Sequence, residues 1–372
     1  MTMASIAGAT PRAASGRARA PQLIVDRTLG GRRVTGLERV TNEMFGDEAL
    51  APFAVEAVTA SSRTQMVLRQ TFTLPALALR RRDALVLCPG FPPTPALTLL
   101  GERVIPYIHD TFLITRKQDL NIRAKLYMTP SFRFAVTRLK RFFVNSEYTR
   151  DELRRFCPPD SEIQLYRPPA KNVFGLSPGG RAARADHRDG PRLIALGTVE
   201  PRKNLLAAAR IVAALHARGL TGARLDIVGR VGWGEEVEEL GAAPGVAIRG
   251  YQPAETVRAF VDEADAMIST SHDEGLGLPM LEAQYAGLPV IAPGGRVFRE
   301  ALRDSGLYIA PDDPAGAAAA IAAALSAPNW RARAEAAALA NVARWNAAAA
   351  RDHREVLELI ARRAPARSAA AC

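Results

Sequence analysis

Two carboxylates, Glu274 and Glu282, stand eight positions apart in the glycine-rich segment 271–283. Glu274 lies in a predicted loop. Glu282 lies just inside a helix that Pro279 can open, because proline suits the first helical position. Backbone N–H groups at 275–278 could hold a diphosphate. Glu282 could then accept hydrogen bonds from ribose hydroxyls, while Glu274 reaches a sugar at the other end. The spacing fits a nucleotide-diphosphate-sugar; the alternative is two acids that only favour a helix start.

The elements around this segment place it at the end of a parallel strand. The apolar run 266–268 predicts a strand before the loop, and 288–292 predicts another after the helix. Ligands of open α/β sheets bind outside the carboxyl ends of the strands. The predicted strand–loop–helix–strand unit therefore presents both carboxylates where a ligand would bind.

The rest of the second half repeats the alternation of short apolar strands with helices, which predicts a doubly wound parallel sheet. Strands are expected at 192–196, 225–228 and 246–249, and helices at 205–218, 254–264, 315–325 and 332–362. In the first half, strands are expected at 23–26, 85–88, 103–108 and 142–145, and a helix at 37–45. Each of these four strands runs into a polar or glycine-rich loop, so the first half is predicted to form a second α/β domain.

These patterns predict two Rossmann-like domains and their boundaries. We expect a disordered leader (1–20), an N-terminal domain (21–176), a linker (177–191), a C-terminal domain (192–345), a closing helix packed back on the N-terminal domain (346–363) and a disordered tail (364–372). With 372 residues, 48% hydrophobic and 23% charged, the composition is that of a soluble two-domain protein. Three cysteines without C-x-x-C spacing favour a reducing cytoplasm, and five scattered histidines predict no metal site.

The positive charge is unevenly distributed. Residues 1–180 hold 26 Lys and Arg against 15 Asp and Glu, whereas 181–372 hold 23 of each, so the +11 excess belongs to the first half. This asymmetry indicates an anionic partner, either nucleic acid or a membrane surface, and no nucleic-acid motif is present. The densest stretch, 116–141, interleaves bases with apolar residues. It is either an interfacial segment or a core-packing helix with a solvated basic face.

These residues resemble the retaining GT-B-fold glycosyltransferases of family 4, also grouped as glycosyl transferases group 1. The resemblance spans about residues 22–330. In the second half it rests on segments 197–204 (GTVEPRKN), 228–233, 274–283 and 287–292. In the first half it rests on 35–39 (TGLER), His109-Asp110 and 146–149. One departure is Asp273, because members more often carry a bulky or aromatic residue before the first glutamate.

The resemblance implies a GT-B fold, in which two doubly wound domains face each other across a cleft. The N-terminal domain would take the acceptor and the C-terminal domain the nucleotide-sugar. The implied reaction is a retaining, metal-independent hexosyl transfer to a hydroxyl of a glycan or glycolipid, in surface polysaccharide or lipopolysaccharide assembly. The acceptor hydroxyl would attack the sugar from the same face from which the phosphate leaves. The leaving phosphate would take the proton of that hydroxyl.

The implied site has a catalytic and a donor-binding group. Fixed cations stabilise the charge that grows on a leaving diphosphate, which suits Arg202 and Lys203, although both could be ordinary surface bases. His109, after a predicted strand, could bind a sugar hydroxyl or the acceptor, or be a structural histidine. We expect catalysis from Arg202, Lys203, Glu274 and His109, and donor binding from Gly36, Gly197, Gly229, Gly275, Leu276, Gly277, Leu278 and Glu282.

No cofactor beyond the donor is expected. The Gly232-Trp233 pair resembles that of mannosyltransferase-like members, which implies GDP-mannose as the donor, with a UDP-sugar as the alternative. Expected partners are the sugar nucleotide, a glycan or polyprenyl-diphosphate-linked acceptor and an anionic membrane surface, but no specific nucleic acid. The expected location is cytoplasmic, peripheral on the inner face of the membrane.

Three other functions remain as alternatives. The first is a dinucleotide-dependent oxidoreductase, but its glycines at 229, 232 and 234 have the wrong spacing. The others are a sugar-nucleotide epimerase or hydrolase, and a non-catalytic interaction protein.

Overall fold

The computed structural model describes residues 22–29, 36–117, 120, 124–180, 189–232 and 236–363. The predicted leader and tail, residues 30–35 of the predicted glycine-rich loop 30–36, residues 181–188 of the predicted linker and Trp233 lie outside these residues. Within the described parts, the strands form two parallel six-stranded sheets, ordered β2-β1-β3-β4-β5-β6 and β12-β11-β10-β7-β8-β9. The predicted doubly wound fold is confirmed. Both sheets are wound in two directions from their first strand, β1 or β7, so both have a switch point, where ligands of such sheets bind.

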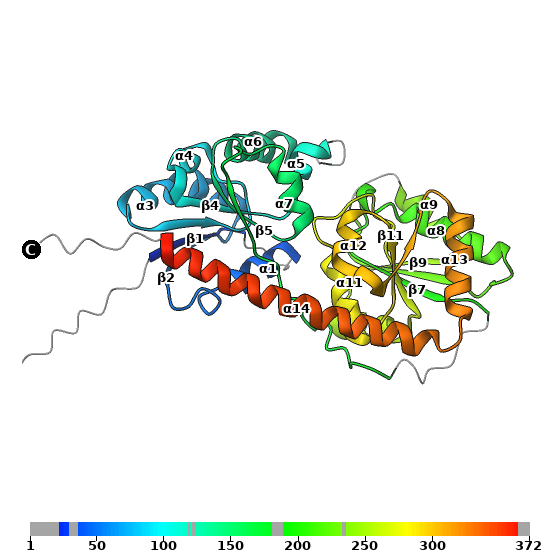
Figure 1. Ribbon diagram of the computed structural model, residues 1–372. Helices are drawn as coiled ribbons and strands as arrows, with labels where there is room; N and C mark the ends of the chain where they lie inside the picture. Colours follow the sequence, from blue (N-terminus) through cyan, green and yellow to red (C-terminus); the bar gives the residue numbers. More distant parts are fainter. Residues whose placement is uncertain are drawn as a thin grey trace, which may run out of the picture.

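The N-terminal sheet is covered by helices on both faces (Figure 1). Its strands are β1 (Gln22–Arg27), β2 (Ala54–Thr59), β3 (Leu85–Cys88), β4 (Val104–Ile108), β5 (Arg141–Val144) and β6 (Glu162–Leu165). Its helices are α1 (Gly36–Met44), α2 (Arg63–Leu68), the π-helical turn η1 (Arg69–Thr73), α3 (Leu74–Arg80), α4 (Pro95–Thr98), α5 (Phe112–Thr115), a second π-helical turn η4 (Ala124–Met128), α6 (Thr129–Val136) and α7 (Glu147–Arg154).

Strand β1 shows how the sequence divides the N-terminal core into two layers. Successive side chains of a strand point to opposite faces of the sheet. Leu23 and Val25 therefore pack with residues of α1 on one face, whereas Ile24 packs with residues of α3 and α6 on the other. All three are fully buried, so the centre of β1 is a short apolar run covered on both faces.

The C-terminal sheet is built in the same way. Its strands are β7 (Arg192–Leu196), β8 (Arg224–Val228), β9 (Val246–Gly250), β10 (Ala266–Ile268), β11 (Val290–Pro293) and β12 (Gly306–Ile309). Its helices are α8 (Leu205–Ala217), α9 (Glu236–Ala242), α10 (Ala254–Glu263), α11 (Leu278–Ala283), α12 (Arg296–Leu302) and α13 (Pro314–Ser326). Helices α8, α9 and α13 share one core cluster, and α10, α11 and α12 share another.

The long helix α14 (Trp330–Arg363) joins the two halves (Figure 1, red). At its start, Arg331 forms a buried ion pair with Asp265 of the C-terminal half, with 2.6 Å between nitrogen and oxygen. Midway, the fully buried Trp345 donates its indole N–H to the carbonyl of Pro168. Near its end, Val356 and Ile360 pack into the core of the N-terminal half. Within the described residues, no helix is both long and apolar enough to cross a membrane.

Candidate functional site

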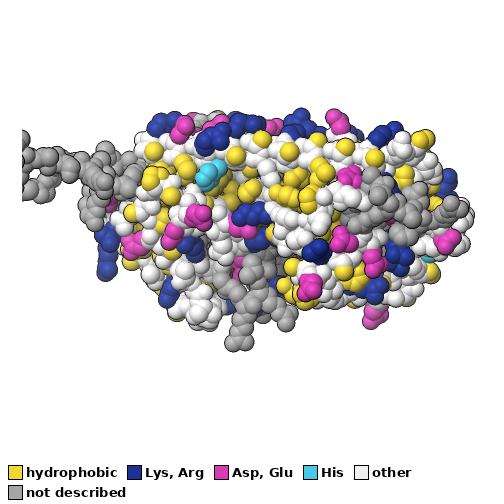
Figure 2. All heavy atoms as spheres, turned by 90° about the horizontal axis from the view of Figure 1, so that it is seen from below, with side chains coloured by type: hydrophobic (Ala, Val, Ile, Leu, Met, Phe, Trp, Pro, Cys, Tyr) yellow, Lys and Arg dark blue, Asp and Glu magenta, His cyan; other side chains and the backbone are white. Residues whose placement is uncertain are grey.

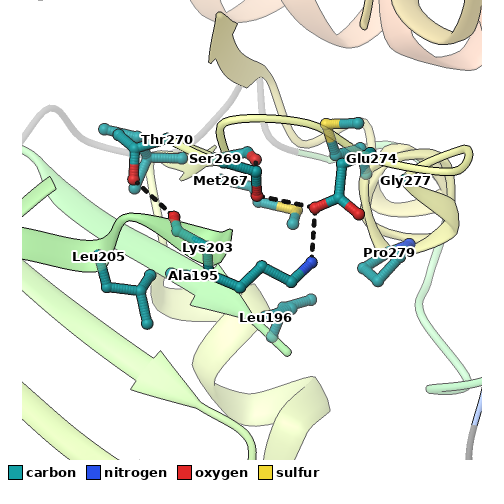
Figure 3. A pocket seen from close by; sticks show the side chains of 13 residues that line it. Ala195, Leu196, Lys203, Leu205, Met267, Ser269, Thr270, Glu274, Gly277 and Pro279 are labelled. Carbon is teal, nitrogen blue, oxygen red and sulfur yellow. Dashed lines mark hydrogen bonds and ion pairs between the residues drawn. The ribbon is translucent and has the colours of Figure 1, made fainter. Parts of the chain in front are cut away.

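Glu274 is buried at the centre of a cluster of charges, and Figure 3 shows its contact with Lys203. Its Oε1 accepts hydrogen bonds from Lys203 Nζ at 2.6 Å and from the Ser271 hydroxyl at 2.7 Å. Its Oε2 accepts one from an Arg202 guanidinium nitrogen at 2.9 Å. Arg202 also bonds the carboxylate of Glu200. Both predicted cations therefore converge on the first predicted carboxylate.

The surrounding charges decide the ionisation of Glu274, which is 7% exposed. Burial alone would raise its pKa, but the positive charges of Lys203 and Arg202 outweigh burial and hold the pKa of Glu274 at about 2. The carboxylate is therefore ionised throughout the physiological range. The packing is tight, leaving a crevice of only about 20 Å³ beside Lys203 and Glu274.

The two loops that carry these residues are fastened to each other. Arg202 and Lys203 form a single 3₁₀ turn, Pro201–Lys203, which ends at Asn204 in the left-handed region with φ 48°. The hydroxyl of Thr270 donates to the Asn204 carbonyl at 2.8 Å, and the His272 N–H donates to the Arg202 carbonyl at 3.0 Å. The turn after β7 and the loop after β10 therefore form one unit.

The structure explains why two positions of the motif, 275 and 277, are occupied by glycine. Gly277 precedes α11 in the left-handed region, with φ 80°, and a Cβ there would collide with Met280. Gly275 faces the other half of the molecule, because a Cβ there would lie 2.5 Å from the carbonyl oxygen of His109. Leu276 between them is buried in the core cluster around Trp345, so only its backbone could face a ligand.

Glu282 lines a separate, larger cavity of about 500 Å³ between the two halves. Its side chain is hydrogen-bonded and ion-paired to Arg39 of helix α1. Burial raises the pKa of Glu282 to about 7, although the Arg39 charge acts in the opposite direction. The same cavity is lined by further predicted donor-binding residues, namely Gly36, Gly197, Gly229 and Leu278.

His109 follows β4 and lines a third cavity, of about 270 Å³, on the N-terminal side. Its Nε2 lies 2.7 Å from the carbonyl oxygen of Pro89. A carbonyl only accepts, so Nε2 carries the proton. Burial lowers the pKa of His109 to about 4, so the ring is neutral and Nδ1 is left as an acceptor.

The wall of this 270 Å³ cavity is mainly apolar, with Phe91, Leu113, Met128 and Phe132 among its residues. Its polar groups are His109, Asp110 and Arg202. Burial raises the pKa of Asp110 to about 6, against the opposing charge of Arg202. Arg202 thus belongs both to this cavity and to the Glu274 cluster.

The two halves also meet directly at the Glu274 loop. The Tyr148 hydroxyl of α7 donates to Asp273 Oδ2 at 2.8 Å. The hydroxyls of Ser146 and Thr149 each lie 3.3 Å from the carbonyl oxygen of Gly275, to which they donate. Sequence reasoning placed 146–149 in the family pattern but gave Tyr148 no role. It also missed Arg39 and Asp110 as site residues.

The sequence of the C-terminal half matches a known family model. Residues 190–327 match the family model described as "Glycosyl transferases group 1". This part of the chain is a glycosyl transferases group 1 domain. It holds Arg202, Lys203, Glu274 and Glu282, so the four charged residues predicted for the donor side all lie inside the domain.

Individual relatives carry related names. The chain is 26% identical over 246 residues to the O-antigen chain mannosyltransferase B of Escherichia coli, a match that covers 62% of this chain and 63% of the relative. It is 34% identical over 203 residues to a D-inositol 3-phosphate glycosyltransferase of Geodermatophilus obscurus, covering 48% of this chain and 44% of the relative. This chain thus spans 63% of the length of the first of these curated relatives and 44% of the second.

The whole fold also matches solved structures. One is that of Anabaena HepE in complex with UDP and glucose, with a TM-score of 0.64, 13% identity, and coverage of 92% of this chain and 100% of that chain. At this identity the likeness shows the fold, which is the GT-B fold of glycosyltransferases. The predicted GT-B arrangement around the glycosyl transferases group 1 domain is therefore confirmed.

Proposed function

We propose that this chain is a glycosyltransferase that moves a sugar from a nucleoside diphosphate sugar to a hydroxyl group of an acceptor. The observation that carries this proposal is the Glu274 carboxylate held between Lys203 and Arg202, eight positions before a second buried carboxylate, Glu282. Both residues lie inside the glycosyl transferases group 1 domain. Glu274 would bind the sugar end of the donor, and Glu282 would bind its ribose.

The donor would lie in the 500 Å³ cavity. Glu282 would accept hydrogen bonds from the ribose hydroxyls in place of its present partner Arg39. The diphosphate would lie towards the start of α11, where Leu278 and Pro279 belong to the cavity wall. The solved structure with UDP and glucose supports a nucleoside diphosphate sugar in general. The mannosyltransferase name of the Escherichia coli relative supports mannose as the sugar.

Arg202 and Lys203 would act on the leaving group. The bond between the anomeric carbon and the diphosphate oxygen breaks, and negative charge grows on the diphosphate as it leaves. Preorganised cations in a dry site stabilise such charge most where it develops. The hydrogen bonds that Arg202 and Lys203 make to Glu274 would hold both side chains beside the leaving diphosphate.

We propose that the sugar keeps its anomeric configuration. A double displacement would need a carboxylate nucleophile, but both oxygens of Glu274 are already engaged by Lys203, Ser271 and Arg202. The acceptor hydroxyl would instead attack from the side that the phosphate leaves, and the leaving phosphate oxygen would take its proton. Nδ1 of His109 would accept a hydrogen bond from a sugar hydroxyl.

The acceptor would enter from the N-terminal side. The 270 Å³ cavity joins the Glu274 cluster through Arg202, and its buried polar groups could orient a hydroxyl against an otherwise apolar wall. A glycan or a polyprenyl-diphosphate-linked acceptor fits this description, and the O-antigen chain relative supports a role in surface polysaccharide or lipopolysaccharide assembly.

An acceptor of this kind is held at a membrane, which we propose the protein reaches by peripheral binding to an anionic surface. The basic stretch 116–141 is less suited to this contact than its sequence indicates. Lys140 is already paired with Asp160, and Arg141, with a side chain 13% exposed, is paired with Glu102. We therefore move the proposed surface to helices α2 and α3.

This second surface combines exposed apolar and basic side chains. Val67, Leu68, Phe72 and Leu79 are 37–65% exposed, while Leu74 and Ala78 on the opposite side are buried. The segment 63–82 has five arginines and no acidic residue, and one of these arginines, Arg81, is ion-paired with Glu56 of β2. By contrast, the face seen in Figure 2 mixes basic and acidic side chains. A basic and apolar surface fits an anionic bilayer, where each nearby arginine contributes about 1 kcal/mol.

Vesicle sedimentation tests this part of the proposal. We expect binding to phosphatidylglycerol vesicles at low salt, release at high salt, and no binding to phosphatidylcholine vesicles. Phe72→Ser with Leu68→Ser should weaken binding, whereas Lys140→Ala, which removes a paired charge, should not. Equal binding to both kinds of vesicle, or an unaffected double variant, would contradict the surface.

The donor proposal is tested by thermal stabilisation with a panel that includes UDP-glucose and GDP-mannose. A ligand at 100 times its dissociation constant adds about 2.7 kcal/mol to the free energy of unfolding, which is a measurable rise in the melting temperature. At least one sugar nucleotide should stabilise the wild type, and Glu282→Ala should reduce that effect. If no sugar nucleotide stabilises the protein while an unrelated dinucleotide such as NAD does, the oxidoreductase alternative is favoured instead.

A further inference from the structure

Asp273, the residue before Glu274, links the loop that carries Glu274 to the opposite half of the molecule. Asp273 Oδ1 accepts the backbone N–H of Glu274 at 2.8 Å. Asp273 Oδ2 accepts the hydroxyl of Tyr148 at 2.8 Å. Tyr148 lies in helix α7 of the N-terminal half, 125 positions away in the chain. One carboxylate therefore connects the backbone of Glu274 to the opposite half of the molecule.

Tyr148 is itself held in place by the C-terminal half. Glu300 of α12 accepts the backbone N–H groups of Glu147 at 2.7 Å and of Tyr148 at 2.8 Å, so it caps the start of α7. Within α7, the Ser146 hydroxyl accepts the N–H of Thr149 at 3.0 Å. The first turn of α7 is thus fixed against the C-terminal half before Tyr148 reaches Asp273.

The backbone contact at Gly275 shows how close the two halves come at this loop. The Gly275 carbonyl accepts two hydroxyls of the first turn of α7, and its Cα faces the carbonyl oxygen of His109 without room for a side chain. A small outward movement of α7 would therefore break the contacts at Asp273 and Gly275 together. The position of the loop backbone around Glu274 therefore depends on the contact between the two halves.

Asp273 does not belong to the charge cluster itself. Its two oxygens are used by Tyr148 and by the backbone of Glu274, whereas Arg202 bonds only its carbonyl. The sequence departs from the family pattern at this position, where a bulky or aromatic residue is more common. The acidic residue at 273 is thus explained by a hydrogen-bond partner on the other half.

We propose that Tyr148 and Asp273 are a positioning pair: across the contact between the two halves they fix the backbone of Glu274, whose carboxylate is held by Lys203 and Arg202. In this proposal Asp273 holds Glu274 in position and does not touch the transferred sugar. Reacting groups must be held within a fraction of an ångström to act, and closing motions often complete a catalytic site. The inference rests on the proposed transferase function for its kinetic test but not for its structural test.

The kinetic test uses Tyr148→Phe, which removes one hydroxyl and leaves the ring. We expect kcat to fall about ten- to hundredfold, the loss typical of misplacing a reacting group by about 1 Å, with the dissociation constant of the donor unchanged. Asp273→Leu also removes the acceptor of the Glu274 backbone N–H, so it should lower kcat at least as much, and the double variant should be no worse than Asp273→Leu alone. The matched control is Tyr285→Phe, which removes a hydroxyl that bonds the Ala170 carbonyl away from Glu274.

The structural test is amide hydrogen exchange of segment 273–278, which needs no turnover. Exchange should be faster in Tyr148→Phe than in the wild type and in Tyr285→Phe. Equal exchange in all three proteins would overturn the proposal, as would an unchanged kcat in Tyr148→Phe. Multiplicative losses in the double variant would also overturn it, because Asp273 would then act on the sugar independently of Tyr148. A wild type without transferase activity would refute the proposed function and leave the exchange test standing.

Discussion

Replacing Glu282 by glutamine removes a charge that the donor needs while keeping the size of the side chain. Glu282 is 3% exposed and lies in the wall of the 500 Å³ cavity. Glutamine keeps one acceptor oxygen but puts an NH₂ donor in place of the other, so one ribose hydroxyl loses its acceptor, at a cost of about 1–3 kcal/mol. We therefore expect Glu282→Gln to raise the dissociation constant of the sugar nucleotide about 5- to 150-fold at pH 8.

The pKa of Glu282, about 7, adds a pH dependence with a definite sign. At pH 8 the carboxylate is about 90% ionised, and at pH 6 about 10%. If the ionised form binds the ribose, the apparent dissociation constant of the wild type rises about tenfold from pH 8 to pH 6. Glu282→Gln cannot titrate, so its affinity should stay flat over this range.

Isothermal titration calorimetry with UDP-glucose or GDP-mannose measures both effects, because the diphosphate of a sugar nucleotide does not titrate between pH 6 and pH 8. The matched control is Glu238→Gln on the exposed side of α9, which should bind like the wild type at both values. Equal affinity of Glu282→Gln and wild type at pH 8 would remove Glu282 from the donor site. A wild-type affinity independent of pH would refute the role of its ionised form.

Three further variants test the site and the fold. Lys203→Met should lower kcat more than donor affinity in single-turnover kinetics, since the leaving-group charge peaks in the transition state; a rise in KM alone would contradict this. Gly275→Ala should lower kcat by forcing the halves apart at His109, whereas Gly241→Ala, which has open space around its Cα, should not. Trp345→Ala should cost about 3–5 kcal/mol in urea unfolding, because it leaves a large buried cavity in α14.

The sequence predicts this site best where the residues are close together in the chain. Glu274, Glu282 and the loop between them lie in one strand–loop–helix unit, and Pro279 and Gly277 mark its turn and helix start. The predicted strand 266–268 is observed as β10 with these bounds. Local turn chemistry and hydrophobic periodicity are enough here, because both carboxylates are positioned by one short segment.

The contacts between the halves could not be predicted in the same way. Arg39 lies 243 positions from Glu282, and Tyr148 lies 125 positions from Asp273. No periodicity or spacing links such positions, because they meet only through the arrangement of two separately folded sheets. The charge-rich stretch 116–141 is a similar case, since its sequence does not reveal that Lys140 and Arg141 are paired with acids from other segments.

Three strands missed by the sequence analysis share a place in the fold. Strands β2, β6 and β12 are each at the edge of a sheet. An edge strand is covered less completely than a central one, so its apolar pattern is weaker. In β2, Val58 is the one buried residue of the six, and in β6 all four residues are partly exposed. The central strands, buried on both faces, gave clear apolar runs.

The central claim is that the Glu274 cluster transfers a sugar from a nucleoside diphosphate. The most direct measurement is nucleoside diphosphate release by the purified protein from UDP-glucose and GDP-mannose, with and without a polyprenyl-diphosphate-linked saccharide, in the wild type and in Glu274→Gln. We predict acceptor-dependent release by the wild type, formation of a product that keeps the donor's anomeric configuration, and a loss of at least about 100-fold in Glu274→Gln. Acceptor-dependent release that is as fast in Glu274→Gln as in the wild type would contradict the claim.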